Sequence, residues 1–310
     1  MQIQWYPGHM HKASKELKEI LPSIDLIIEI LDARIPFSSQ NPMLASIRGN
    51  KPCIKILNKD DLADAGKTQQ WQEYLDQQKD IKTIAINMSH PERIKQLTTL
   101  CHKMVKGKKT SDEPLNAVIM GIPNVGKSTI INIVAGRGIA KTGNEPAVTK
   151  GQQRIALKEH NILLFDTPGM LWGNIENMNS GYRLAATGAI KDTAIDIDDI
   201  GFFTAEYLIQ EYPQSLIKRY QLHYAPTTEL EFLEELGRKR GCLRSGGRVD
   251  LVKASKILLT ELRAGILGGI TFETPAMMEK ELKETAIIVA KKEQKKAERK
   301  VRRKKKIINR

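Results

Sequence analysis

The sequence predicts an α/β fold in which a mostly parallel six-stranded sheet is followed by an all-helical region. Short apolar runs typical of buried strands occur at 26–31, 53–57, 83–86, 117–120, 153–157 and 161–165. Amphipathic stretches typical of helices occur at about 11–21, 66–78, 91–105 and 127–135. Strands and helices alternate along the chain, and this favours a parallel sheet with helices on both faces.

Beyond about residue 175 the strand signals thin out and helical periodicity dominates. An amphipathic stretch at 205–212 is broken by Pro213. Thr228 and Glu231 have the spacing of a capping box, and Gly246 and Gly247 precede another amphipathic segment. We therefore predict a domain over residues 1–175, a helical domain over 176–290 and a basic tail over 291–310.

The composition excludes several classes of protein. No apolar run approaches the roughly 20 residues that a membrane helix needs. The first residues lack a charged segment followed by an apolar one, which argues against a secretory signal. Cys53, Cys101 and Cys242 form no CxxC pair, as is usual for reduced thiols. We expect a cytoplasmic protein that does not bind membranes.

The positive charge is concentrated at the C-terminal end of the chain. The net charge is +13, and residues 291–310 contribute +10 of it, with 12 Lys or Arg and 2 Glu. A nearly neutral body with such a tail indicates a polyanionic partner, most simply a nucleic acid. The alternative is a solvated end with no partner.

Residues 121–128, GIPNVGKS, match the phosphate-loop pattern G-x-x-x-x-G-K-[ST]. The segment follows an apolar strand and opens into a helical pattern, which is the context that this motif requires. Lys127 can reach the β- and γ-phosphates of a nucleotide, and the Ser128 hydroxyl can bind Mg²⁺. Backbone and side-chain contacts to the nucleotide are also expected from Asn124, Val125, Gly126 and Thr129.

A second motif, Asp166-Thr167-Pro168-Gly169, ends the strand at 161–165. Asp166 can hold Mg²⁺ through its water shell, and the backbone N–H of Gly169 can face the γ-phosphate. Thr149, on the intervening segment, is the expected second hydroxyl ligand of Mg²⁺. Thr142 is a weaker candidate for the same role.

The apolar run at 53–57 leads into Asn58-Lys59-Asp60-Asp61. The Asp61 carboxylate can accept two hydrogen bonds from guanine, whereas adenine presents an acceptor at the same place and is rejected. Asn58 can bond the ring and reach the phosphate loop, and the Lys59 stem can cover the face of the ring. Asn87 follows the next strand and is expected on the same side of the base. GTP and GDP are the nucleotides that this set selects.

The order of these motifs is unusual, because the base motif precedes the phosphate loop. In an ordinary G domain the base motif comes last. Residues 106–116 would bridge the original chain ends, which is feasible because the termini of compact domains often lie close together. The sequence thus predicts a circularly permuted P-loop G domain.

The chain resembles the ribosome biogenesis GTPase A family over nearly its whole length. The resemblance rests on QWYPGHM (4–10), LDARIPFSSQNP (31–42), NKDD, GIPNVGKST, DTPG, LAATGAIKD (184–192) and GCLRSGG (241–247). It implies a GTPase of late large-subunit assembly, with a helical C-terminal domain that contacts ribosomal RNA. Expected partners are a large-subunit precursor and its rRNA, with the protein monomeric off the ribosome.

Two explanations compete for how hydrolysis occurs. The residue after the Asp-Thr-Pro-Gly motif is Met170, where many GTPases carry a glutamine that orients water. Either the protein hydrolyses slowly or another residue supplies the catalytic group. The resemblance implies His9 for that role, whereas the alternative is that His9 lies in a turn or touches RNA. Asn124 is similar to the asparagine of K⁺-dependent GTPases, so K⁺ is a further expected cofactor.

Two other functions fit parts of the sequence. An RNA-binding scaffold could use GTP mainly as a structural element. A P-loop ATPase is opposed by the guanine-type motif at 58–61. We also expect the helical domain to follow nucleotide state through the Asp-Thr-Pro-Gly segment, about ten residues before it, while residues 58–61 only select the base.

Overall fold

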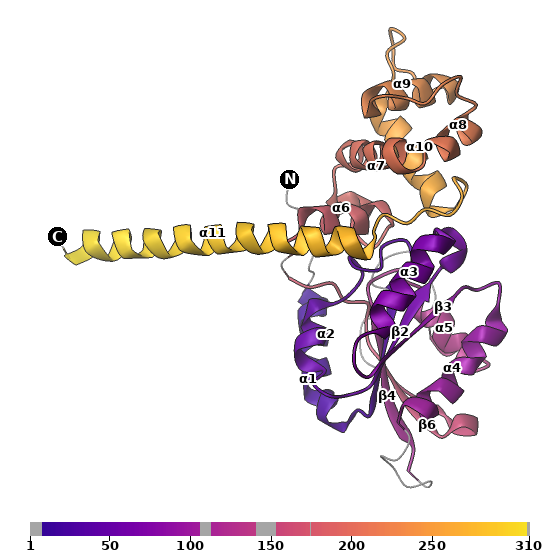
Figure 1. Cartoon of the computed structure of the whole chain (residues 1–310), viewed down its shortest axis with the longest axis vertical. Coiled ribbons are helices and arrows are strands. Elements are labelled where there is room, and N and C mark those ends of the chain that lie inside the picture. The colour runs from indigo at the N-terminus through magenta and orange to yellow at the C-terminus, as the bar shows by residue number, and fades with distance from the viewer. Residues whose placement is uncertain (1–7, 106–112, 141–152, 174, 309–310) are drawn as a thin grey trace.

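A computed structural model describes residues 8–105, 113–140, 153–173 and 175–308 of the chain. A twisted sheet with helices forms the N-terminal part, and a cluster of helices lies at one end of this sheet (Figure 1). A long helix projects sideways from the junction between the two parts.

The sheet has six strands in the order β3-β2-β1-β4-β6-β5. Their bounds are β1 Leu26–Asp32, β2 Cys53–Asn58, β3 Ile81–Ile86, β4 Leu115–Gly121, β5 Gln153–Leu157 and β6 Ile162–Asp166. All neighbours are parallel except β5 and β6, which are antiparallel. Every residue of β1 and β2 is buried, as expected for central strands covered on both faces. The predicted fold class is confirmed.

Helices cover both faces of the sheet. One face bears α1 (Gly8–Ile20), α2 (Pro42–Ile47) and α3 (Ala65–Asp76), and the other bears α4 (Pro91–Met104) and α5 (Lys127–Val134). Alternate residues of β1 divide between the two faces, with Ile27 packed in the α1 cluster and Ile28 in the α4 cluster. The short helix α2 was not predicted from the sequence; Pro42 starts it and the Asn41 side chain caps it.

The helical region begins soon after β6. It contains α6 (Met178–Ala186), α7 (Ile197–Glu211), α8 (Pro213–Tyr220), α9 (Glu229–Lys239) and α10 (Leu251–Arg263). Pro213 ends one helix and starts the next, as its missing N–H allows at a first helical position. The predicted capping box is half right: Thr228 caps α9 by accepting from the Glu231 N–H, but the Glu231 carboxylate bonds Thr227.

Residues 265–273, called here the return segment, lead from α10 back to the sheet. The Ile270 N–H donates to the Leu62 carbonyl at 3.0 Å, and the Phe272 N–H donates to the Arg34 carbonyl at 2.8 Å. The helical region therefore meets the sheet domain beside residues 58–61 as well as after β6. The expectation that residues 58–61 only select the base is incomplete, because the loop that continues from them is packed against the helical region.

Helix α11 (Pro275–Ile308) is the long projecting helix (Figure 1). Its first turns are anchored, since Met278 and Glu281 are buried and Arg183 donates to Glu281 at 2.6 Å. Further along, Leu282, Ile287 and Ile288 are exposed. No helix in the described part of the chain is both long enough and apolar enough to cross a membrane.

Candidate nucleotide-binding site

The phosphate-loop residues lie in a tight turn between β4 and α5. The turn uses left-handed backbone at Asn124 (φ 58°) and Gly126 (φ 93°). A Cβ on Gly126 would collide with the Asn58 amide, so glycine is required both for its conformation and for the close approach. Val125 is buried, and Ser128 and Thr129 are half-buried in the first turn of α5. The N–H groups at this end of α5 form the kind of surface that binds phosphate.

Asn58 joins the predicted base motif to the predicted phosphate loop. Its amide donates to the Val125 carbonyl at 2.6 Å, between residues 67 positions apart in the sequence. The side chain is 1% exposed, and its Oδ1 has no hydrogen-bond partner within the described residues. The structure thus brings the two motifs together as the sequence predicted.

Lys127 and Asp166 form a buried ion pair between the phosphate loop and the end of β6. Burial raises the pKa of Asp166 above its usual value, even though the Lys127 charge opposes this. The second oxygen of Asp166, Oδ2, is buried with no hydrogen-bond partner among the residues described. A buried carboxylate oxygen without a donor, on a residue paired with the lysine that precedes Ser128, fits a hard cation such as Mg²⁺. Thr149 lies outside the described residues, as does Thr142.

Gly169 lies against the phosphate loop. A Cβ on this residue would come within 3.0 Å of the Pro123 Cα, so a side chain would push the two loops apart. The next residue, Met170, donates its N–H to the Gly121 carbonyl at 3.0 Å, and its side chain is buried in the cluster that includes Val118. Met170 thus packs in the core, as the first of the two hydrolysis alternatives supposed.

Lys59 and Asp61 lie at the other end of this region. Asp61 is exposed on the short helix η2 (Asp60–Leu62), and Lys59 immediately before it has left-handed backbone with φ 62°. The Lys59 ammonium donates to Asp32 Oδ2 at 3.0 Å. Asn87 donates to Asp60 rather than to Asp61. The Asp61 carboxylate is left facing solvent, where a ligand can reach it.

Asp32 and Arg34 were not predicted as site residues. Asp32 accepts from Arg34 Nε at 2.9 Å and Nη2 at 2.7 Å, in addition to Lys59. Burial disfavours the Asp32 carboxylate, but the charges of Arg34 and Lys59 outweigh it and hold its pKa well below the usual range. One sequence signal was available: Asp32 ends a strand next to β2, and the register places it opposite Asn58.

The phosphate loop is also tied to the helical region. The Asn124 amide donates to the Gly188 carbonyl at 2.9 Å, just beyond the end of α6. The backbone of His9 lies in the first turn of α1, next to the fully buried Met10. The His9 side chain lies outside the described part of the structure, so its predicted role remains a prediction.

The chain is similar to known proteins over most of its length. A family model described as a 50S ribosome-binding GTPase matches residues 116–220. The protein named Ribosome biogenesis GTPase A from Bacillus cereus is 43% identical over 282 residues, covering 89% of this chain and 95% of that protein. The protein of the same name from Thermotoga maritima is 31% identical over 273 residues, with coverages of 88% and 95%.

Two solved structures share the fold. The GDP-bound structure of TM YlqF has a TM-score of 0.60 and 27% identity, covering 84% of this chain and 99% of that one. GNP-bound YlqF from T. maritima has a TM-score of 0.59 and 28% identity, with coverages of 85% and 98%. Proteins of this fold have therefore been observed with guanine nucleotides bound.

Proposed function

The chain belongs to the ribosome biogenesis GTPase A family, and we propose that it binds and hydrolyses GTP to promote late assembly of the large ribosomal subunit. The observation that carries this proposal most directly is the hydrogen bond from Asn58 to Val125. It supports the proposal because it joins the guanine-type motif directly to the phosphate-loop sequence. The proposed setting is the cytoplasm, with the protein monomeric off the ribosome.

We propose that Asp61 recognises the guanine edge. A carboxylate accepts from both the ring N–H and the exocyclic amine of guanine, and it has no donor to meet in adenine. Lys59 holds its stem beside the ring because its ammonium is bound to Asp32. Asn87 supports the same loop through Asp60.

At the phosphate end, Lys127 binds the β- and γ-phosphates once it leaves Asp166. That movement frees the Asp166 carboxylate, which with Ser128 and Thr149 would hold Mg²⁺. The ion would supply positive charge to the phosphates as charge develops in phosphoryl transfer. Backbone N–H groups at Gly126, Thr129 and Gly169 donate to the remaining phosphate oxygens.

The catalytic group proposed for hydrolysis is His9. Met170 is buried and has no polar group that could orient a water molecule. An imidazole titrates near neutral pH and can orient or polarise water. If His9→Ala leaves the hydrolysis rate on large subunits unchanged, this assignment is wrong and the slow-hydrolysis alternative stands.

K⁺ is proposed as a second cation, near Asn124. The amide of Asn124 already donates to Gly188, so the side chain is held in one orientation beside the phosphate loop. A cation at this position would add charge near the bridging phosphate oxygen. Equal hydrolysis rates in K⁺ and Na⁺ would remove it from the site.

The proposed partner is a precursor of the large subunit and its rRNA. Helix α11 carries most of the chain's excess positive charge and projects away from the body, where phosphates can reach it (Figure 1). A second candidate function is an RNA-binding scaffold in which GTP is structural, and the buried Met170 favours it. Turnover distinguishes the two, because a scaffold does not accelerate hydrolysis when it binds the subunit.

The proposal is tested by co-sedimentation with large-subunit particles. We expect the protein to sediment with the particles in a non-hydrolysable GTP analogue and to remain in the supernatant in GDP. Equal sedimentation in both nucleotides would contradict a nucleotide-controlled assembly factor.

A further inference from the structure

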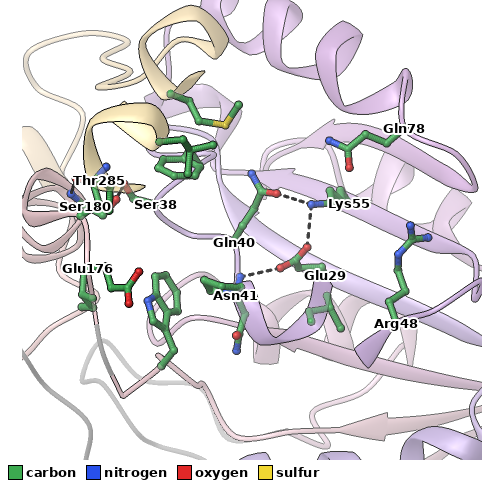
Figure 2. Close-up of a pocket in the computed structure, with 18 of the residues that line it drawn as sticks. Glu29, Ser38, Gln40, Asn41, Arg48, Lys55, Gln78, Glu176, Ser180 and Thr285 are labelled. Carbon is green, nitrogen blue, oxygen red and sulfur yellow. Dashed lines mark hydrogen bonds and ion pairs between the residues drawn. The ribbon is translucent and has the colours of Figure 1, made fainter. Parts of the chain in front are cut away.

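A cavity of about 650 Å³ lies between α2, the start of α6 and the first turns of α11. Its floor is a buried ion pair in the sheet, with Lys55 Nζ 3.2 Å from Glu29 Oε2 (Figure 2). Lys55 also donates to Gln40 at 2.5 Å, and Glu29 accepts from the Asn41 N–H at 3.0 Å. The charges of the floor are thus already paired, and the walls decide what the cavity binds.

The walls combine aromatic faces with polar edges. Phe37, Tyr74 and Trp172 line the cavity, and Gln78 and Arg48 lie at its edge on either side of Lys55 (Figure 2). Proteins hold an unpaired nucleobase by stacking it on aromatic side chains and bonding its edges with amide or guanidinium groups. The Arg48 guanidinium already donates to the Lys51 carbonyl at 2.9 Å, so the exposed Gln78 amide is the group that the edge of an occupant would meet.

Helix α11 links the cavity to the basic tail. Met278, Leu282 and Thr285 line the cavity, and the exposed Lys291 and Lys292 follow on the same helix. The helical rise places Lys291 about 9 Å beyond Thr285, close enough for the phosphates that flank one bound nucleotide. This charge favours an RNA strand over a peptide as the occupant.

One wall of the cavity belongs to the phosphate-sensing segment. Trp172 and Ile175 line the cavity and follow Gly169, which lies against the phosphate loop, by only three and six residues. An occupant that packs on Trp172 therefore touches the chain that would respond to the γ-phosphate.

We propose that this cavity binds one unpaired nucleobase of RNA, stacked among Phe37, Tyr74 and Trp172 while α11 binds the adjoining phosphates. The proposal rests on the proposed function, because it names how ribosomal RNA is held. It assigns a base-binding site separate from the guanine-nucleotide site. It also gives a route by which bound RNA acts on the segment after Gly169.

The test uses RNA hairpins that differ only in one bulged residue. Four hairpins carry a bulged adenosine, guanosine, cytidine or uridine, and a fifth carries an abasic residue with the same number of phosphates. Their affinities for the full chain are measured by fluorescence anisotropy. At least one base should bind about tenfold more tightly than the abasic hairpin, the size expected for stacking one base on aromatic side chains.

Two matched variants place the effect in the cavity. Thr285→Glu adds a carboxylate to the cavity wall, and Ala286→Glu adds the same charge one residue along on an exposed position. Ala286→Glu should keep the tenfold preference for a base, and Thr285→Glu should lose it. Basal GTP hydrolysis should be the same in both, because neither residue belongs to the nucleotide site.

Several outcomes would overturn the proposal. If the wild-type chain binds all five hairpins equally, α11 binds the phosphates and the cavity binds no base. If Thr285→Glu keeps the preference, the base lies elsewhere. If hairpins bind equally but Thr285→Glu sediments with large-subunit particles less well than Ala286→Glu, the cavity holds a ribosomal protein. In each case, sedimentation that still depends on the GTP analogue would leave the proposed function intact.

Discussion

The two halves of the proposed nucleotide site are built differently. The base half is braced from several directions: Asn58 is tied to the phosphate loop, Lys59 to Asp32, and the loop beyond Asp61 to the return segment. The phosphate half is also held by hydrogen bonds at Val125 and Asn124, but the charged groups that would meet the phosphates, Lys127 and Asp166, are paired only with each other among the described residues, and Asp166 Oδ2 has no partner there.

The difference indicates that the two halves have separate roles. A half whose backbone and side chains are braced at several points is expected to change little when its ligand arrives, and this suits selection of the base. A half that must exchange an ion pair for phosphates and a cation changes with the nucleotide, and it suits sensing. Since the return segment packs on the base half, the helical region has a fixed attachment there and a nucleotide-sensitive one beyond Gly169.

The largest effect is expected from Lys127→Ala, which removes the cation of the phosphate half. GTP hydrolysis should fall by about a thousandfold, because transition-state charge on the phosphates loses its main side-chain partner. Single-turnover hydrolysis measures the loss, and circular dichroism checks that the variant is folded. Lys158→Ala, at an exposed lysine in the turn between β5 and β6, should keep the wild-type rate. A loss below tenfold for Lys127→Ala would contradict this role.

Asp32→Asn should lower the free energy of unfolding, because it removes the charge that braces the base half. Arg34 and Lys59 would face an uncharged buried amide, at a cost of about 3 kcal/mol in the free energy of unfolding. Because the pKa of Asp32 is lowered by folding, its stabilisation is complete above the ordinary value of 3.8 and is lost as pH falls below it. The variant's deficit should therefore be constant from pH 7 to pH 5 and shrink at pH 3.

Urea unfolding at the three pH values measures this deficit. The exposed Asp199→Asn serves as the control and should be close to wild type throughout. If the deficit of Asp32→Asn grows at pH 3, or is absent at pH 7, the buried charge cluster does not brace the base half.

Asp61→Asn should change the choice of base and leave the fold intact, since Asp61 is exposed. The amide offers a donor to the 2-oxo group of xanthine, so preference should move from GTP toward xanthosine triphosphate by about a hundredfold. Competition against a fluorescent GDP analogue measures the ratio. Asp60→Asn should keep the preference for GTP, because Asp60 bonds Asn87. An unchanged ratio in Asp61→Asn would take Asp61 out of the base site.

The smallest effect is expected where the return segment touches the base half. Thr271 Oγ1 accepts from the Asp64 N–H at 3.0 Å and donates to the Ala33 carbonyl at 3.3 Å. Thr271→Val removes both bonds at similar volume and should lower stability by about 1–2 kcal/mol. GDP affinity should fall a few-fold, as measured by fluorescence titration. The exposed Thr260→Val should not change the GDP affinity. If both variants have the same GDP affinity, the return segment does not influence binding at the base half.

The parts of the structure predicted from the sequence were those with local patterns. Runs such as 53–57 and 153–157 identified strands because apolar residues recur within a few positions. The short helix α2 has too few residues to show a period. The return segment could not be predicted, because the hydrogen bond from the Asp64 N–H to Thr271 Oγ1 joins positions 207 apart. No local periodicity encodes such a contact.

The same distinction between local patterns and long-range contacts holds for the residues of the proposed site. Motif residues such as Asn58 and Lys127 were found because their chemistry fixes their spacing. The bracing of Lys59 by Asp32 was missed, although the strand register makes it natural. Asp32 ends β1 and the base motif begins at the end of β2, so a known strand order would have predicted that they meet.

We propose that the phosphate half of this GTPase is completed on the ribosomal particle. Steady-state GTP hydrolysis, measured with and without purified large subunits, tests this most directly. We expect slow turnover of the protein alone and a rise of at least about tenfold with subunits, as for GTPases completed by a partner. An unchanged rate under conditions where the protein co-sediments with the subunits would contradict it and favour the scaffold.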